Sequence, residues 1–124
     1  MNLKDLKEKY NAYTYLSGEE ALEAVKQDEF VLKYVKEQTP EICLEAVKQN
    51  GYALQYVKDQ TEEICLEAVK QDGFVLRYVK EQTPEICLEA VKQNGEALRY
   101  VNPDIFKELE NQEDMVDLGD GIIL

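Results

Sequence analysis

The sequence predicts an all-α protein, an α-solenoid of tandem 22-residue helical-hairpin repeats with terminal caps. The first observation is a repeat, since residues 41–61 recur at 63–83 with 16 of 21 positions identical. The second is its period, because Leu44, Leu66 and Leu88 stand 22 residues apart. Self-similarity at this period is typical of a solenoid, in which each unit buries its apolar face only against its neighbours.

The chain divides into four parts along its length of 124 residues. We expect a degenerate N-terminal capping repeat at 1–18 and four helical-hairpin repeats at 19–103. A capping helix at 104–111 should cover the open end of the stack, and an acidic tail at 112–124 is expected to be mobile. An apolar content of 44% is enough for one continuous core.

Each repeat should begin with a helix of about eleven residues. Thr39-Pro40-Glu41 predicts its start, because Thr can cap free amides, Pro suits the first helical position and Glu complements the helix dipole. Apolar residues then follow at helical spacing: Ile42, Cys43, Ala46 and Val47.

A second, shorter helix should follow a turn at Asn50-Gly51. We expect Gly51, Gly73 and Gly95 to end the first helices in the left-handed conformation, which glycine adopts without steric cost. Glu29 stands at this position in the first repeat, so the same interpretation predicts strain there and a gain in stability from Glu29→Gly.

The 22-residue period also suits a leucine-rich repeat. Aligning the asparagine of that motif on Asn50 puts Glu45 where an apolar residue is required, and the Ala-rich segments have poor strand propensity. The helical alternative is therefore preferred.

The formal charge of −12 shapes the expected partners. Direct nucleic-acid binding is disfavoured, because every Lys of the repeats has Glu or Asp close by. No segment has the length and apolarity of a membrane span or a signal peptide, so a cytoplasmic protein is expected. A protein partner with a basic surface is favoured instead.

No residues with the pattern of a catalytic or metal site are found. The chain has no His, and it lacks a phosphate-binding glycine loop, so we expect no enzyme activity and no cofactor. Cys43, Cys65 and Cys87 recur one unit apart, too far to share a metal ion, and Ala21 at the same position in the first repeat marks a small, buried site.

The string Ala-Val-Lys-Gln-Asn-Gly followed by Tyr-Ala-Leu-Gln-Tyr-Val, at residues 46–57, resembles the signature of an uncharacterised family of short helical repeats. This family is described as a domain of unknown function, and it occurs in tandem in bacteria, phages, giant viruses and some protists. The resemblance covers roughly residues 20–101. It implies the same architecture and carries no established activity.

Two sets of residues are candidates for partner binding. An acidic row without Lys at helical spacing lines one edge of the stack: Glu19, Glu41, Glu63 and Glu85. Tyr52 and Phe74, beside the turns, are the apolar candidates, whereas the column of Tyr34, Tyr56, Tyr78 and Tyr100 is expected to be core.

These residues predict a protein-binding repeat module without chemistry of its own, acting through its stacked-helix surface. The alternative is an acidic inhibitor, of a phage or mobile-element counter-defence type. It would block a host nucleic-acid-handling enzyme by placing carboxylates where phosphates bind.

Overall fold

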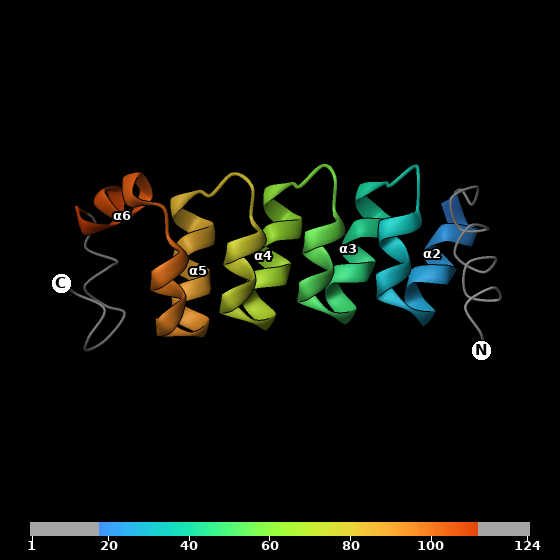
Figure 1. Cartoon of the computed structure of the whole chain (residues 1–124), viewed down its shortest axis with the longest axis horizontal. Coiled ribbons are helices and arrows are strands. Elements are labelled where there is room, and N and C mark those ends of the chain that lie inside the picture. Colours follow the sequence, from blue (N-terminus) through green and yellow to red (C-terminus); the bar gives the residue numbers. More distant parts are fainter. Residues whose placement is uncertain (1–17, 112–124) are drawn as a thin grey trace.

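A computed structural model describes residues 18–111, so the N-terminal cap expected at 1–18, apart from Gly18, and the acidic tail expected at 112–124 lie outside the described residues. Four units, each an α-helix followed by a six-residue 3₁₀ helix, are stacked side by side in chain order (Figure 1). A final helix follows at the C-terminal end of the stack. The elements are α2 (Gly18–Gln27), η1 (Glu29–Tyr34), α3 (Pro40–Gln49), η2 (Gly51–Tyr56), α4 (Glu62–Gln71), η3 (Gly73–Tyr78), α5 (Pro84–Gln93), η4 (Gly95–Tyr100) and α6 (Pro103–Glu110).

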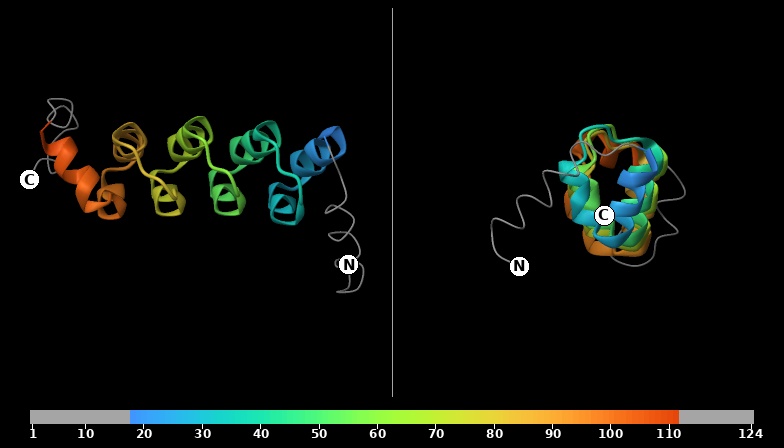
Figure 2. Two further views of the ribbon diagram at one scale, coloured as in Figure 1. Left: turned by 90° about the horizontal axis from the view of Figure 1, so that it is seen from above. Right: turned by 90° about the vertical axis from the view of Figure 1, so that its right-hand side faces the viewer.

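The units form two layers. Viewed from above, helices α2 to α5 make one row and the 3₁₀ helices η1 to η4 make the other (Figure 2). Each α-helix contacts the α-helices of the adjacent units as well as the 3₁₀ helices of its own and the preceding unit. No strand occurs between residues 18 and 111, and the predicted solenoid fold is confirmed.

The predicted helix start is also confirmed. The hydroxyl of Thr39 accepts a hydrogen bond from the amide of Ile42 at 3.2 Å, and Pro40 occupies the first turn. Thr61 and Thr83 cap α4 and α5 in the same way. The second helix is short, as expected, but it is a 3₁₀ helix.

The turn between the two helices corrects the sequence interpretation. Among the described residues only Gly18 has a positive φ, of 48°, so Gly51, Gly73 and Gly95 are not in the left-handed region. The α-helix ends instead at an extended Asn or Asp, such as Asn50 with φ −154°. Its side-chain oxygen accepts a hydrogen bond from the amide two residues on and so starts the 3₁₀ helix. Asp28, Asp72 and Asn94 do the same.

Glycine is needed in the turn because of the neighbouring unit. A Cβ on Gly51 would lie 2.7 Å from the carbonyl oxygen of Ala68 in α4, and a Cβ on Gly73 would meet the carbonyl oxygen of Ala90. Glu29 does not have a positive φ, so the left-handed strain expected there is absent, and its carboxylate accepts a 3.3 Å hydrogen bond from Asn50. The gain in stability from Glu29→Gly is therefore no longer expected.

The core is a continuous apolar layer between the two rows. In the second unit it takes Ile42, Ala46 and Val47 from α3 with Ala53 and Leu54 from η2, and the other units repeat the pattern. No polar or charged side chain is buried among residues 18–111. Leu109 of α6 is fully buried at the C-terminal end of this layer. None of the described helices is long and apolar enough to cross a bilayer.

Two columns of glutamines join successive units. The turn glutamines, Gln49, Gln71 and Gln93, end α3, α4 and α5. The Nε2 of Gln49 donates to the carbonyl of Val25 in the preceding unit at 2.7 Å, and Gln71 donates likewise to Val47. The Oε1 of Gln71 also accepts from the amide of Gly51 at 3.1 Å.

The linker glutamines, Gln38, Gln60 and Gln82, do the same at the opposite edge. The Nε2 of Gln60 donates to the carbonyl of Tyr78 at 2.9 Å, and its Oε1 accepts from the amide of Lys80 at 2.9 Å. Each unit is therefore tied to the next at both ends of its helices. These bonds satisfy backbone groups that the 3₁₀ helices and linkers leave unpaired.

Candidate protein-interaction surfaces

The predicted acidic row lies at the edge of the stack where the linkers run and the α-helices begin. Glu19, Glu41, Glu63 and Glu85 each stand in the first turn of their helix, and all four are exposed. The helix dipole favours negative charge at this end. The one ion pair among the described residues, Lys26 with Glu23, lies elsewhere, so the row is brought to one edge without an ion pair.

Two carboxylates of this edge lie close together between the third and fourth units. Glu62 occupies the position that Pro40 and Pro84 hold in the adjacent units, and it lies beside Glu85. A hydrogen bond with Glu85, followed by some loss of hydration and by repulsion between the two charges, raises the pKa of the exposed Glu62. Approach of a cation would relieve this repulsion.

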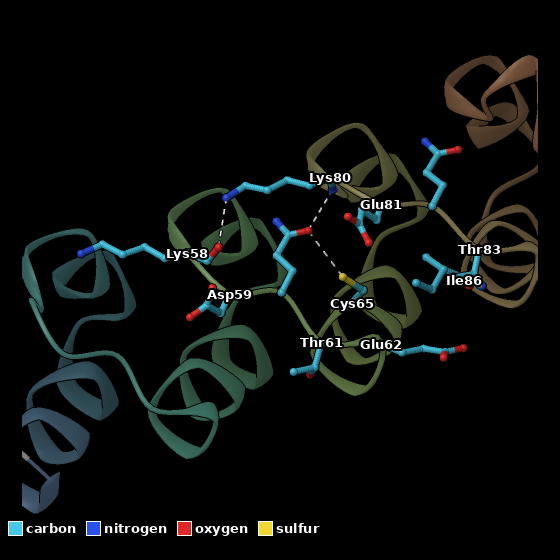
Figure 3. A pocket seen from close by; sticks show the side chains of 11 residues that line it. Lys58, Asp59, Thr61, Glu62, Cys65, Lys80, Glu81, Thr83 and Ile86 are labelled. Atoms are coloured by element: carbon cyan, nitrogen blue, oxygen red, sulfur yellow. Dashed lines mark hydrogen bonds between the residues drawn. The ribbon is translucent and has the colours of Figure 1, made fainter.

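A groove of about 480 Å³ opens at the same edge (Figure 3). Its walls are the linkers that follow η2 and η3 and the starts of α4 and α5. Asp59, Glu62 and Glu81 contribute carboxylates to its lining, which also includes Thr61, Cys65, Thr83 and Ile86. A second hollow of about 470 Å³ lies between the first two units and includes Glu19 and Glu41.

The lysines of this edge are directed to the backbone. The Nζ of Lys80 donates to the carbonyl of Lys58 at 3.2 Å, and the Nζ of Lys58 donates to the carbonyl of Lys36 at 3.4 Å. Figure 3 shows Lys80 reaching from its own linker to the carbonyl of Lys58, so that its side chain spans the two linkers that wall the groove. The carboxylates of the edge are therefore left without ion pairs in residues 18–111.

Tyr52 and Phe74, the apolar candidates, lie on the opposite layer. Both are half-buried, and each packs edge to face against a tyrosine of the next unit, Tyr52 on Tyr78 and Phe74 on Tyr100. The Tyr52 hydroxyl donates to Asp72 at 2.9 Å, and burial followed by this carboxylate raises the pKa of Tyr52. The column of Tyr34, Tyr56, Tyr78 and Tyr100, which was expected to be core, is half-buried as well. The rings predicted to be core and those predicted to bind a partner therefore form one surface.

The cysteines are buried thiols that donate hydrogen bonds. The Sγ of Cys43 lies 3.5 Å from the Oε1 of Gln38, and the same contact is 3.6 Å at Cys65 and 3.3 Å at Cys87. No three residues of His, Cys, Asp or Glu in the described part are grouped to hold a metal.

These thiols predict a pH dependence of stability. Burial raises the pKa to about 11 for Cys43 and Cys65 and about 12 for Cys87, with Asp59 and Glu62 adding to the first two. The pKa of each thiol is higher in the folded protein than in the unfolded chain. The contribution of the thiols to the free energy of unfolding is therefore intact below about pH 9, and it is lost between there and about pH 11 as the thiols of the unfolded chain ionise. Melting temperature should fall more steeply over that range than in the triple Cys→Ala variant, and equal slopes would contradict the burial.

Sequence reasoning missed both glutamine columns. Their signal was present, because Gln recurs at 38, 60 and 82 and at 49, 71 and 93, where a merely solvated surface would allow many polar residues. A polar residue repeated without substitution in an array points to a contact between units. The linker glutamines also identify the acceptor of each cysteine thiol.

The stacked units, their continuous core and the bonds between them define an α-solenoid repeat protein. The family model for Domain of unknown function (DUF4116) matches three overlapping stretches, residues 19–61, 39–83 and 61–107, each spanning about two units. The chain therefore belongs to this family, and the resemblance seen in the sequence is confirmed. No curated protein and no solved structure matches the chain significantly.

Proposed function

We propose that this protein is a non-enzymatic binding module whose acidic linker edge takes a basic segment of a protein partner. The observation that supports this is the row of four exposed first-turn carboxylates, at the same place on successive units and without an ion pair in residues 18–111. Stacked helices lie roughly 8 to 10 Å apart, so a partner running along the edge meets one carboxylate at each step.

The array is suited to present such a row. The linker glutamines hold the adjoining backbone of each unit to that of the next, so that the carboxylates are fixed in register before a partner arrives. Preorganisation of this kind lowers the entropic cost of binding. We place the protein in the cytoplasm, where the free thiols of Cys43, Cys65 and Cys87 would stay reduced.

The proposal predicts a loss of affinity on neutralising the row. A fluorescent peptide with Lys at every third position should bind the parent protein, and the triple variant of Glu41, Glu63 and Glu85 to Gln should bind it about tenfold more weakly at 0.15 M salt. Melting temperature should stay within the range of surface changes. Fluorescence anisotropy measures the affinity.

A matched control removes the same charge elsewhere on the same helices. The half-buried Glu45, Glu67 and Glu89, changed together to Gln, should leave the affinity within about threefold, because net charge acts weakly at a distance under screening. Equal loss in both variants would mean that net charge, and not the edge, governs binding.

The acidic inhibitor is a second candidate, supported by the pairing of Glu62 with Glu85 at the same edge. Spacing of about 10 Å between units corresponds to about three axial steps of 3.4 Å along a nucleic-acid strand. This candidate predicts that the protein competes with DNA for a basic enzyme groove. A basic peptide partner whose complex is unaffected by DNA would argue against it.

A further inference from the structure

A second surface, opposite in character to the linker edge, runs along the layer of 3₁₀ helices. We call it the aromatic stripe, and it is built from one ring near the end of each 3₁₀ helix and, in η1 to η3, one ring near the start. Rings of successive units meet edge to face, with centroids 6.0 Å apart for Phe30 and Tyr56, 6.0 Å for Tyr52 and Tyr78, and 5.8 Å for Phe74 and Tyr100.

Cations lie over this stripe at regular intervals. The Arg77 guanidinium is 4.9 Å from the ring centre of Tyr78 and 5.7 Å from that of Tyr52. Lys33 lies over the rings of Tyr34 and Tyr56 at 5.0 and 5.5 Å. Arg99 lies over the Tyr100 ring at 5.9 Å. The corresponding position of the second unit is Gln55.

These cations are not used in ion pairs within the described residues. Lys33, Arg77 and Arg99 are exposed, and none is paired with a carboxylate there. The chain has two arginines in all, and both lie on this stripe although the net charge is −12. Phe30, at the first unit, is the one large apolar side chain among residues 18–111 that is classed as exposed, at 39%.

The carboxylates on or beside the 3₁₀ helices do not form ion pairs with these cations among the described residues. Asp72 accepts from the Phe74 amide and the Tyr52 hydroxyl, and Glu29 accepts from Asn50. Glu96 is exposed on η4 and forms no ion pair with Arg99. The Arg77 guanidinium also hydrogen-bonds the Tyr78 and Tyr100 hydroxyls, and because a guanidinium has five N–H donors, its other donors can still meet an external anion.

We propose that the aromatic stripe binds an extended acidic peptide segment, with its carboxylates on Lys33, Arg77 and Arg99. A guanidinium lying on a tyrosine ring keeps its N–H groups free for bidentate contact with a carboxylate, and the ring restricts its motion. The half-buried rings offer apolar contact to the side chains between the carboxylates.

Geometry sets the spacing of that segment. Units about 8 to 10 Å apart correspond to about three residues of extended chain at 3.3 Å per residue. One acidic residue in every three would therefore place a carboxylate at each unit. Repulsion from the acidic linker edge is screened over about 8 Å at physiological salt.

The test uses a fluorescent 15-residue peptide with Glu at every third position, titrated into the full chain at 0.15 M salt. The Arg77→Gln, Arg99→Gln double variant should bind it about tenfold more weakly than the parent. The matched control, Lys70→Gln with Lys92→Gln on the α-helical layer, should bind within about twofold of the parent.

A substitution that is expected to strengthen binding is also tested, because damage to the fold would not raise the affinity. Gln55→Arg supplies the missing cation of the second unit and should strengthen binding by about two- to fivefold, whereas Glu20→Gln makes the same charge change on the exposed first turn of α2 and should not. Equal effects of the two substitutions would overturn the proposal. So would equal affinity for a peptide with Gln in place of Glu, or tighter binding of poly(U) than of the Glu peptide. Because probe and variants differ from those of the linker edge, either proposal can fail alone.

Discussion

Gln60→Leu should lower the free energy of unfolding by about 2 to 4 kcal/mol, because two backbone groups of the next unit lose their partners in a half-buried site. Its Nε2 donates to the carbonyl of Tyr78, and its Oε1 accepts from the amide of Lys80. Leucine retains the bulk but supplies neither bond. Urea denaturation followed by circular dichroism measures the change.

The shape of the transition should change as well. In a stack, neighbouring units are coupled through their interfaces, and a weakened interface lets the two sides unfold separately. A broader transition is therefore expected when Gln60 is replaced. Gln55→Leu is the control, since Gln55 is exposed and bonds only within its own 3₁₀ helix, to Tyr52. If both variants lose the same stability, the linker glutamines do not join the units.

Gly73→Ala is the second large effect, with an expected cost of about 2 to 3 kcal/mol from overpacking against the backbone. The new Cβ would meet the carbonyl oxygen of Ala90 and would lie 3.2 Å from the Cβ of Asn94. Gly51→Ala, which faces a single crowded carbonyl oxygen at 2.7 Å, should cost less. Thermal and urea denaturation of both variants measures the difference.

Gly18→Ala separates crowding from backbone strain. Gly18 has a φ of 48°, and apart from its neighbours along the chain no atom of the described residues lies within 4 Å of the Cβ that a substitution would add. Alanine there should cost about 1 to 2 kcal/mol through the left-handed conformation alone. If Gly73→Ala proves harmless while Gly18→Ala does not, the close approach between units has been misassigned.

The repeat pattern predicted the parts of the fold that are local or periodic. Thr39-Pro40 marks a helix start by its own chemistry, and the 22-residue period identifies equivalent positions. The second helix was found as a short element, but its 3₁₀ form depends on the side chain of Asn50 bonding to the amide of Tyr52. That bond joins residues two apart in the chain, and it competes with the backbone hydrogen bonds that would continue the α-helix.

What sequence reasoning missed depends on the distance between units. Gly51 was assigned a left-handed conformation because local rules explain a glycine after a helix in that way, whereas the deciding contact comes from Ala68, seventeen residues on. Gln71 looks like a surface residue within its own helix, and its role emerges only once Val47 is placed beside it. A single unit contains neither fact.

The candidate surfaces divide in the same way. The acidic row was visible because Glu63 and Glu85 recur at helix starts, where exposure follows from position. The cations above the aromatic stripe were not found, because Arg77 is over Tyr52 of the preceding unit and the sequence gives no measure of that distance.

Site-specific photo-cross-linking in the organism of origin tests the central claim, that the linker edge is where a protein partner binds. A photoreactive phenylalanine analogue at position 63, on that edge, is compared with the same analogue at position 70, exposed at the opposite end of α4. We expect a discrete protein adduct from position 63, lost when Glu41 and Glu85 are also changed to Gln, and none from position 70. An adduct from position 70 with none from position 63 would contradict the account.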